Sequence, residues 1–230
     1  MTSMTSARPF ELLVFDWDGT LMDSIATIVA CTREAFVDAG VAAPDEGVIR
    51  DTIGLGLRET IDRLAPAGGE DLFERVVSSY RGRWLATYRE RQLLFGGVPE
   101  LLARLAGDGY LLAVATGKGR RGLDHALRSH GLEARFQATR TADEAPSKPH
   151  PQMLWDLLDE LGVAPESALM IGDSVHDLEM ARAAGVAALA VASGAHGRRE
   201  LESRAPLGCL DAVGDLPFWL AAVATSTATP

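Results

Sequence analysis

The sequence predicts an α/β fold, a Rossmann-like doubly wound parallel sheet with a small all-helical cap domain inserted after the first strand. From Gly96 onward, short apolar runs of strand character alternate with apolar residues at helical spacing. Such alternation favours right-handed β-α-β units, with helices on both faces of a parallel sheet. Residues 22–92 instead have helical spacing throughout, so this block interrupts the sheet after its first strand.

Two parts are therefore expected. Residues 1–21 and 93–230 form the Rossmann-like core, and residues 22–92 form the cap, joined to the core by two linkers. The first strand is the β-prone run Leu12–Phe15, which suits a strand buried on both faces.

Apolar positions in the cap recur at helical spacing in three segments, at residues 25–37, 57–64 and 72–88. Gly40 stands where the first helix would end, and Pro66 follows the second. The third segment carries an aromatic stripe of Tyr80, Trp84 and Tyr88. The stripe could line a substrate pocket, but packing within the cap is the preferred interpretation.

The core segments follow in alternating order. We expect strands at residues 111–115, 136–139, 168–171 and 186–191. Helices are expected around residues 101–105, 123–131, 153–161 and 178–184.

Composition limits the classes of partner. The 230-residue chain has a net charge of -10, which argues against nucleic acid or an anionic membrane. No apolar run approaches the roughly 18 residues of a membrane span. The N-terminal MTSMTSARPF lacks the apolar centre of a secretory signal, so we expect a short loose leader and a cytoplasmic protein. Cys31 and Cys209 lack metal-ligand spacing and are interpreted as structural thiols.

The stretch FDWDGTLMDS places Asp16 and Asp18 directly after the first strand. If the backbone stays extended, the period of two puts both carboxylates on the same side. Two such close negative charges repel each other unless a positive group lies beside them. A divalent cation is the simplest candidate.

Polar groups also follow three later segments: Thr116 in VATGKG, Lys148 in SKPHP, and Asp173 with Asp177 in GDSVHD. Each has an ordinary explanation as a helix cap, a turn or a solvated lysine. Ligands of doubly wound sheets bind outside the carboxyl ends of the strands, where these groups would converge. Together they predict one site at that edge.

These motifs resemble those of the haloacid dehalogenase-like superfamily of phosphohydrolases. The four matching motifs are DWDGT, the Thr116 strand end, Lys148 followed by Pro149, and GDSVHD. The resemblance covers nearly the whole chain, including a helical cap after the first motif. GTLMDS, SKPHPQML and the position of the cap look most like the phosphoglycolate phosphatase-like branch.

The resemblance implies a catalytic role for each motif residue. Asp16 would attack phosphorus and form an aspartyl-phosphate, and Asp18 would act as general acid and then as general base. Thr116 and the amide of Gly117 would hold the phosphate oxygens. Lys148 would neutralise both Asp16 and the phosphate.

The resemblance also implies Mg²⁺, a hard cation that prefers oxygen ligands. The expected ligands are the carboxylates of Asp16 and Asp173 and the backbone carbonyl of Asp18. Asp177 would hold a metal-bound water or Lys148 from outside the ligand set.

The implied function is a Mg²⁺-dependent phosphatase that hydrolyses a small phosphate monoester of the phosphoglycolate type, working as a monomer or homodimer. Its partner would be a small phosphorylated metabolite. In the cap segment GLGLR, Arg58 could bind a substrate carboxylate, although a surface arginine on a helix is an equal interpretation.

Several alternatives stay open: a β-phosphoglucomutase-like sugar-phosphate mutase, a pyrophosphatase, a nucleotide or sugar phosphatase, and a degenerate phosphate-binding regulatory module. Asp18 argues against dehalogenases and phosphonate hydrolases, which lack this acid. No motif residue is missing, as it would be in a degenerate member.

Other polar residues flank the motifs. Lys118, Arg120 and Arg121 could offset the negative charge of the chain, but a solvated helix start is the preferred interpretation. His150 and His176 are interpreted as loop or outer residues that the mechanism does not need.

Overall fold

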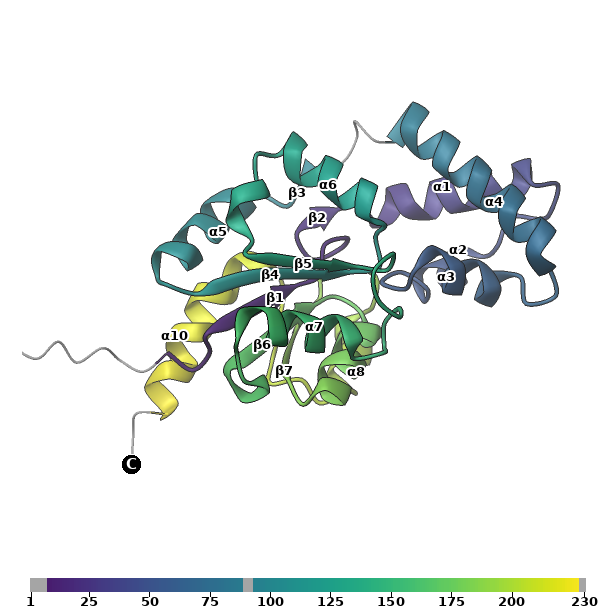
Figure 1. Ribbon diagram of the computed structural model, residues 1–230. Coiled ribbons are helices and arrows are strands. Elements are labelled where there is room, and N and C mark those ends of the chain that lie inside the picture. The colour runs from purple at the N-terminus through teal and green to yellow at the C-terminus, as the bar shows by residue number, and fades with distance from the viewer. Residues whose placement is uncertain (1–7, 89–92, 228–230) are drawn as a thin grey trace, which may run out of the picture.

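The computed structural model describes residues 8–88 and 93–227. A six-stranded sheet has the order β5-β4-β1-β6-β7-β8, and all its neighbouring strands pair in parallel. Figure 1 shows this sheet flanked by helices, with a separate group of helices beyond one end. The predicted α/β class and the doubly wound parallel sheet are confirmed.

The strands are β1 (Leu12–Phe15), β2 (Met22–Asp23), β3 (Leu93–Leu94), β4 (Leu111–Thr116), β5 (Ala138–Thr141), β6 (Ala168–Gly172), β7 (Ala187–Val191) and β8 (Cys209–Leu210). The α-helices are α1 (Ile25–Asp38), α2 (Glu46–Arg50), α3 (Leu57–Leu64), α4 (Gly69–Arg83), α5 (Val98–Gly107), α6 (Arg120–Ser129), α7 (Gln152–Leu161), α8 (Val175–Ala184), α9 (Arg198–Glu202) and α10 (Leu216–Thr227). A π-helical turn, η1 (Trp84–Tyr88), continues α4, and the 3₁₀ turns are η3 (Glu133–Arg135), η4 (Pro165–Ser167) and η5 (Val213–Asp215).

The two faces of the sheet are covered by different helices. α5, α6 and α10 pack on one face and share a core with Phe15 and Val114. On the opposite face, α7 and α8 pack against Val14 and Met170. Neighbouring residues of β1 thus face opposite sides of the sheet, as the period of two requires, and both sides are apolar because both are covered.

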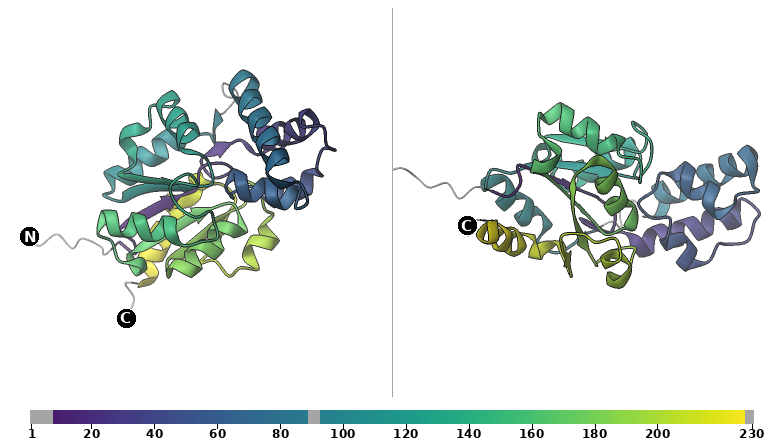
Figure 2. Two further views of the ribbon diagram at one scale, coloured as in Figure 1. Left: turned by 45° about the vertical axis from the view of Figure 1, so that its right-hand side comes forward. Right: turned by 90° about the horizontal axis from the view of Figure 1, so that it is seen from below.

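The helices α1 to α4 and the turn η1, here called the helical unit, lie beyond the carboxyl ends of the strands in Figures 1 and 2. The helical unit has an apolar cluster of its own, which includes Phe36, Ile61 and Val76. Its two connections to the sheet run side by side, because β2 and β3 pair antiparallel. We retain residues 22–92 as a proposal for a cap domain; its last four residues, 89–92, lie outside the described residues, as do the expected leader at 1–7 and the chain end at 228–230.

Some predicted elements differ in detail. The strand expected at 136–139 occupies 138–141, because the buried Phe136 packs on Trp17 before the ladder begins at Ala138. The third cap helix ends at Arg83 and continues as a π-helical turn. α2, α9, β2, β3 and β8 have only two to five residues each and were not predicted, because such short segments show no periodicity. α10 was not predicted either.

No helix in the described part of the chain is long and apolar enough to cross a membrane.

Candidate active site

The topology brings the ends of three neighbouring strands together. Asp16 follows β1, Thr116 ends β4, and Asp173 follows β6. Since β1 lies between β4 and β6, the three side chains meet at one edge of the sheet. Lys148, in the loop after β5, and Asp177, in the first turn of α8, complete the group. This is the edge at which the helical unit lies (Figure 1).

Lys148 bridges two of the carboxylates. Its Nζ lies 2.8 Å from Asp16 Oδ1 and donates to Asp177 Oδ1 at 2.6 Å. Burial raises the pKa of Asp16 well above its usual range, and Lys148 opposes this effect. For Lys148, burial alone would lower the pKa, but the two carboxylates raise it. Lys148 is therefore charged and compensates part of the negative charge in the site.

Asp173 is held by two donors and by two close glycines. Thr20 Oγ1 donates to its Oδ1, and the Ala195 amide donates to its Oδ2, both at 2.7 Å. A Cβ atom at Gly19 or Gly194 would lie 2.2 Å or 1.9 Å from Asp173 Oδ2, so no side chain fits at either position. Burial and the charge of Asp177 raise the pKa of Asp173 to about 7.

Asp177 is fixed by the start of α8. Ser174 and Asp177 form a reciprocal capping box, in which the amide and hydroxyl of Ser174 both donate to Asp177 Oδ2. Because Oδ1 is bound by Lys148, both oxygens of Asp177 already have partners. This placement fits the outer role that the resemblance implies for Asp177.

The carboxylates of Asp16, Asp173 and Asp177 each offer an oxygen within 4.8 Å of the others, and all three residues are buried. The three carboxylates share the single ammonium of Lys148, and burial together with their mutual repulsion raises the pKa of Asp16 and of Asp173. Hard oxygen donors around a buried negative site suit a divalent cation such as Mg²⁺. The residues present therefore fit the expected metal, which would use Asp16 and Asp173 most readily.

The carboxylate of Asp18 is held apart from this cluster. It accepts hydrogen bonds from Ser24 Oγ at 2.8 Å and from Lys118 Nζ at 3.0 and 2.9 Å. The preferred interpretation of Lys118 as part of a solvated helix start is therefore wrong, because its side chain is only 8% exposed and bound to Asp18. The chain has only two lysines, Lys118 and Lys148, and both lie in this site. The scarcity of lysine in the sequence is therefore a signal that could have identified Lys118 as a site residue.

Thr116 and Gly117 occupy the turn after β4. Thr116 is buried, and its Oγ1 accepts from the Lys118 amide at 3.2 Å. A Cβ atom at Gly117 would lie 2.4 Å from the carbonyl oxygen of Leu55 and 2.5 Å from that of Gly54. The backbone of the helical unit thus contacts the loop expected to hold phosphate.

Residues 51–56 of the helical unit, here called the cap loop, form two further contacts with the core. The Gly56 amide donates to Ser147 Oγ at 2.6 Å, and His176 Nε2 lies 2.8 Å from the carbonyl oxygen of Asp51. His176 is therefore a residue that joins the core to the cap loop, a role the sequence did not predict. His150 is exposed and makes an edge contact with the ring of Trp155.

Arg58 is not brought to the carboxylates of the site. Its guanidinium forms ion pairs with Asp62 at 2.9 Å and Glu70 at 2.7 Å, and it lies 4.3 Å from the centroid of the Phe73 ring. These contacts all lie within the helical unit. They favour the interpretation of Arg58 as a surface arginine.

Two residues of the aromatic stripe, Tyr80 and Trp84, contact different parts of the molecule. The Tyr80 and Trp84 rings stack with centroids 5.8 Å apart, and Lys118 Nζ lies 4.8 Å from the centroid of the Trp84 ring. Tyr80 also packs against the apolar cluster of the helical unit. Trp84 therefore faces the site, in contrast to the preferred interpretation of the stripe as packing within the cap. The side chain of Tyr88 lies outside the described residues.

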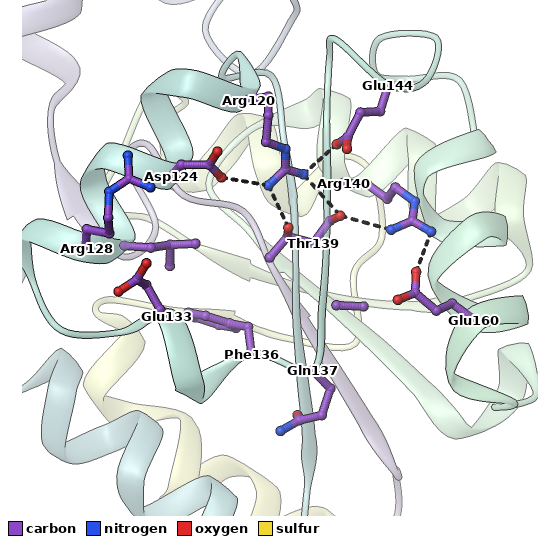
Figure 3. Close-up of a pocket in the computed structure, with 12 residues that line it drawn as sticks. Arg120, Asp124, Arg128, Glu133, Phe136, Gln137, Thr139, Arg140, Glu144 and Glu160 are labelled. Atoms are coloured by element: carbon purple, nitrogen blue, oxygen red, sulfur yellow. Dashed lines mark hydrogen bonds and ion pairs between the residues drawn. The ribbon is translucent and has the colours of Figure 1, made fainter.

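A cavity of about 450 Å³ lies on the β5 side of the sheet and is lined by none of the site carboxylates. Figure 3 shows two of its arginines, Arg120 and Arg140, turned toward acidic partners. Arg120 contacts Glu144 at 2.5 Å and Asp124 at 3.1 Å, and Arg140 contacts Glu160 at 2.5 Å. Arg120 is thus neutralised away from the site, and Arg121 is exposed.

The sequence profile of the family described as "Haloacid dehalogenase-like hydrolase" matches residues 13–191. "Probable phosphatase IndB" of Dickeya dadantii is 37% identical over 212 residues, which cover 89% of this chain and 91% of that protein. A "Phosphoglycolate phosphatase" of Nitrosococcus oceani is 32% identical, over 76% of this chain and 80% of its own.

Solved structures of haloacid dehalogenase-like hydrolases have a similar fold. A haloacid dehalogenase-like family hydrolase from Streptococcus pneumoniae superposes with a TM-score of 0.79 at 26% identity. The superposition covers 94% of this chain and 99% of that one.

Proposed function

The chain belongs to the haloacid dehalogenase-like hydrolase family, and from this membership we propose that it is a Mg²⁺-dependent phosphatase that hydrolyses a small phosphate monoester of the phosphoglycolate type. The observation that carries the proposal is the buried group in which Lys148 lies between Asp16 and Asp177, beside Asp173. Relatives named as phosphatases, one of them a phosphoglycolate phosphatase, support the reaction class.

In the first step, a carboxylate oxygen of Asp16 attacks phosphorus and forms an aspartyl-phosphate. The bond between phosphorus and the ester oxygen breaks, and Asp18 gives its proton to the leaving oxygen. Lys148, 2.8 Å from Asp16, reduces the repulsion between this carboxylate and the incoming dianion. Thr116 and the Gly117 amide hold the phosphoryl oxygens during the transfer.

In the second step, Asp18 takes a proton from a water molecule that attacks the aspartyl-phosphate. The bond between phosphorus and Asp16 breaks, so phosphate leaves and the carboxylate of Asp16 is restored. Ser24 and Lys118 hold the carboxyl group of Asp18 in place for both proton transfers.

The carboxylates of Asp16 and Asp173 and the backbone carbonyl of Asp18 would hold Mg²⁺, with Asp177 outside the ligand set. When bound, the cation would neutralise charge on the phosphoryl group and orient it toward Asp16. We propose further that the substrate is a small phosphorylated metabolite. The protein would act as a monomer or homodimer in the cytoplasm.

The test is phosphate release from a panel of 2-phosphoglycolate, pyrophosphate, mononucleotides and sugar phosphates, with Mg²⁺ or with EDTA. Asp16→Asn is the matched blank, because it keeps the shape of the side chain and removes the nucleophile. We expect Mg²⁺-dependent release that this variant lacks, with 2-phosphoglycolate preferred. Turnover retained by Asp16→Asn would refute the nucleophile, and conversion of a sugar phosphate without phosphate release would instead indicate a mutase.

A further inference from the structure

Helix α6, which follows the residues proposed to hold phosphate, has no side-chain cap of its own. Its N-cap residue is Gly119, which has no side chain that could accept a hydrogen bond from the backbone amides of the first turn. That first turn also contains no acidic residue, which would favour the positive end of the helix. A side-chain cap for α6 therefore has to come from another segment of the chain.

Asp143, in the loop after β5, supplies this cap. Its Oδ2 accepts a hydrogen bond from the Arg120 amide at 2.7 Å. A Cβ atom at Gly119 would lie 2.9 Å from the same oxygen, so the carboxylate can approach only because position 119 has no side chain. The first turn of α6 is thus capped by a residue 23 positions further along the chain.

The loop that presents Asp143 is held by the next residue, Glu144. Glu144 Oε2 accepts hydrogen bonds from the amide and the hydroxyl of Thr141, at 3.0 and 2.9 Å. The Arg120 guanidinium returns to the same turn, with Nη2 2.5 Å from Glu144 Oε2 (Figure 3). Arg120 is therefore bound through its amide by Asp143 and through its side chain by Glu144.

Residues 116–119, here called the phosphate turn, lead directly into this capped end of α6. Only two residues separate Gly117, whose amide would hold phosphoryl oxygens, from Arg120. The position of the first turn of α6 therefore limits where the Gly117 amide can lie. The loop that carries Asp143 continues to Lys148, so the cap also joins the segments that carry two groups of the site.

We propose that Asp143 is a positioning residue, which orders the phosphate turn before the substrate arrives. Without this cap, phosphate would have to order the turn as it binds, and its affinity would be lower for that reason. Because phosphate is an anion, the useful property of Asp143 is its acceptor oxygen rather than its negative charge. The inference rests on the phosphate site of the proposed function, and it adds a residue that lies in none of the four motifs.

The test measures the binding of inorganic phosphate in Mg²⁺ by calorimetry, at a temperature at which every variant is folded. We expect Asp143→Ala to raise the Kd by about fivefold, the effect of one lost helix cap. Asp143→Asn should restore most of the affinity, because its amide oxygen can accept the same hydrogen bond. A role in stability alone would lower Tm in Asp143→Ala and leave the Kd unchanged, and that result would overturn the inference.

Gly119→Ala tests the same contact from the other side. The added Cβ would displace the carboxylate of Asp143, so we expect a similar increase in the Kd. In the Asp143→Ala background the substitution meets no carboxylate, so the double variant should bind phosphate as Asp143→Ala does. If the two increases instead multiply in the double variant, the residues act independently and the inference is overturned.

Asp45→Ala is the matched control. Asp45 Oδ1 accepts from the Gly47 amide at 2.8 Å and caps α2 in the helical unit, so its loss removes a cap of the same kind outside the phosphate turn. The Kd for phosphate should equal that of the unmodified protein. If Asp45→Ala raised the Kd as much as Asp143→Ala does, loss of stability would account for both effects and the inference would fail.

The outcomes separate this inference from the proposed function. If Asp143→Ala weakens phosphate binding but the unmodified protein hydrolyses no ester in the panel, the inference stands and the phosphatase proposal fails. If esters are hydrolysed and the Kd is unchanged in Asp143→Ala, the phosphatase proposal stands and the inference fails. If the unmodified protein neither binds phosphate nor hydrolyses an ester, both fail.

Discussion

The ammonium of Lys148 lies 2.8 Å from Asp16 Oδ1, with both side chains almost completely shielded from water. Such a pair is costly to separate, because removing one partner leaves the other charge buried and uncompensated. The same ammonium also holds Asp177 at 2.6 Å, so it stabilises two carboxylates at once. Lys148 therefore contributes both to stability and to the proposed chemistry.

We expect Lys148→Met to destabilise the metal-free protein by about 3–5 kcal/mol at pH 8. Its kcat should fall at least a hundredfold or so, as it does when a charge-stabilising donor is lost. Urea unfolding in EDTA and phosphate release in Mg²⁺ measure the two effects. Added Mg²⁺ should recover part of the stability, since it supplies positive charge to the same carboxylates; equal stability of the two proteins in EDTA would contradict the prediction.

Close packing at Gly194 gives a second prediction. An added Cβ would lie 1.9 Å from Asp173 Oδ2 and 2.5 Å from Asp173 Cβ, so rotation of the carboxylate alone cannot relieve the contact. We expect Gly194→Ala to displace Asp173 and to raise the Mg²⁺ concentration for half-maximal activity by about tenfold or more. Gly107→Ala, at the end of α5 where a Cβ meets nothing within 4 Å, is the matched control. An unchanged Mg²⁺ requirement in Gly194→Ala would remove Asp173 from the ligand set.

The core and the motif residues could be predicted from the sequence because their signals are local. Alternating apolar segments fix the order of strands and helices, and parallel strands place Asp16, Thr116 and Asp173 at one edge. The surroundings of Lys118 and Arg58 could not be predicted, because their partners lie on other segments of the chain. Lys118 pairs with a residue 100 positions away, and nothing near it in the sequence distinguishes it from a solvated lysine.

The contact between Gly117 and the cap loop gives a third prediction. A Cβ at position 117 would lie within 2.5 Å of the backbone carbonyl oxygens of Gly54 and Leu55. The cap loop, which contains both residues, would therefore have to move away from position 117. We expect Gly117→Ala to raise KM several-fold and to expose the cap loop to proteolysis, because access to the site depends on how closely this loop is held. Gly82→Ala in α4, where a Cβ meets nothing within 4 Å, controls for the substitution itself. An unchanged KM and cleavage pattern would show that the loop adapts without opening.

The last prediction concerns pH and the packing of α1 on α4. Asp38 accepts hydrogen bonds from Arg83 Nη2 at 2.7 Å and from Ser79 Oγ at 2.5 Å. The hydrogen bonds from Arg83 and Ser79 lower the pKa of Asp38 from its usual 3.8 to about 2. The unfolded chain therefore binds more protons than the folded protein between these two values, so stability is lost as the pH falls through this range and is fully present above it.

We expect Asp38→Asn to lower Tm by about 1–3 °C at pH 7, a small change because the pair is solvent-exposed. The difference in Tm between Asp38→Asn and the unmodified protein should narrow by pH 3. At that pH Asp38 is mostly protonated in the unfolded chain, so the ionised Asp38 contributes less to the stability of the folded protein. Melting curves from pH 7 to pH 3 measure the effect. Arg83→Met is the matched background, because Asp38 has lost its strongest partner in that variant. Adding Asp38→Asn to Arg83→Met should therefore change Tm less, and with less dependence on pH, than Asp38→Asn alone. A Tm difference that stays constant down to pH 3 would show that Asp38 acts through packing rather than through its charge.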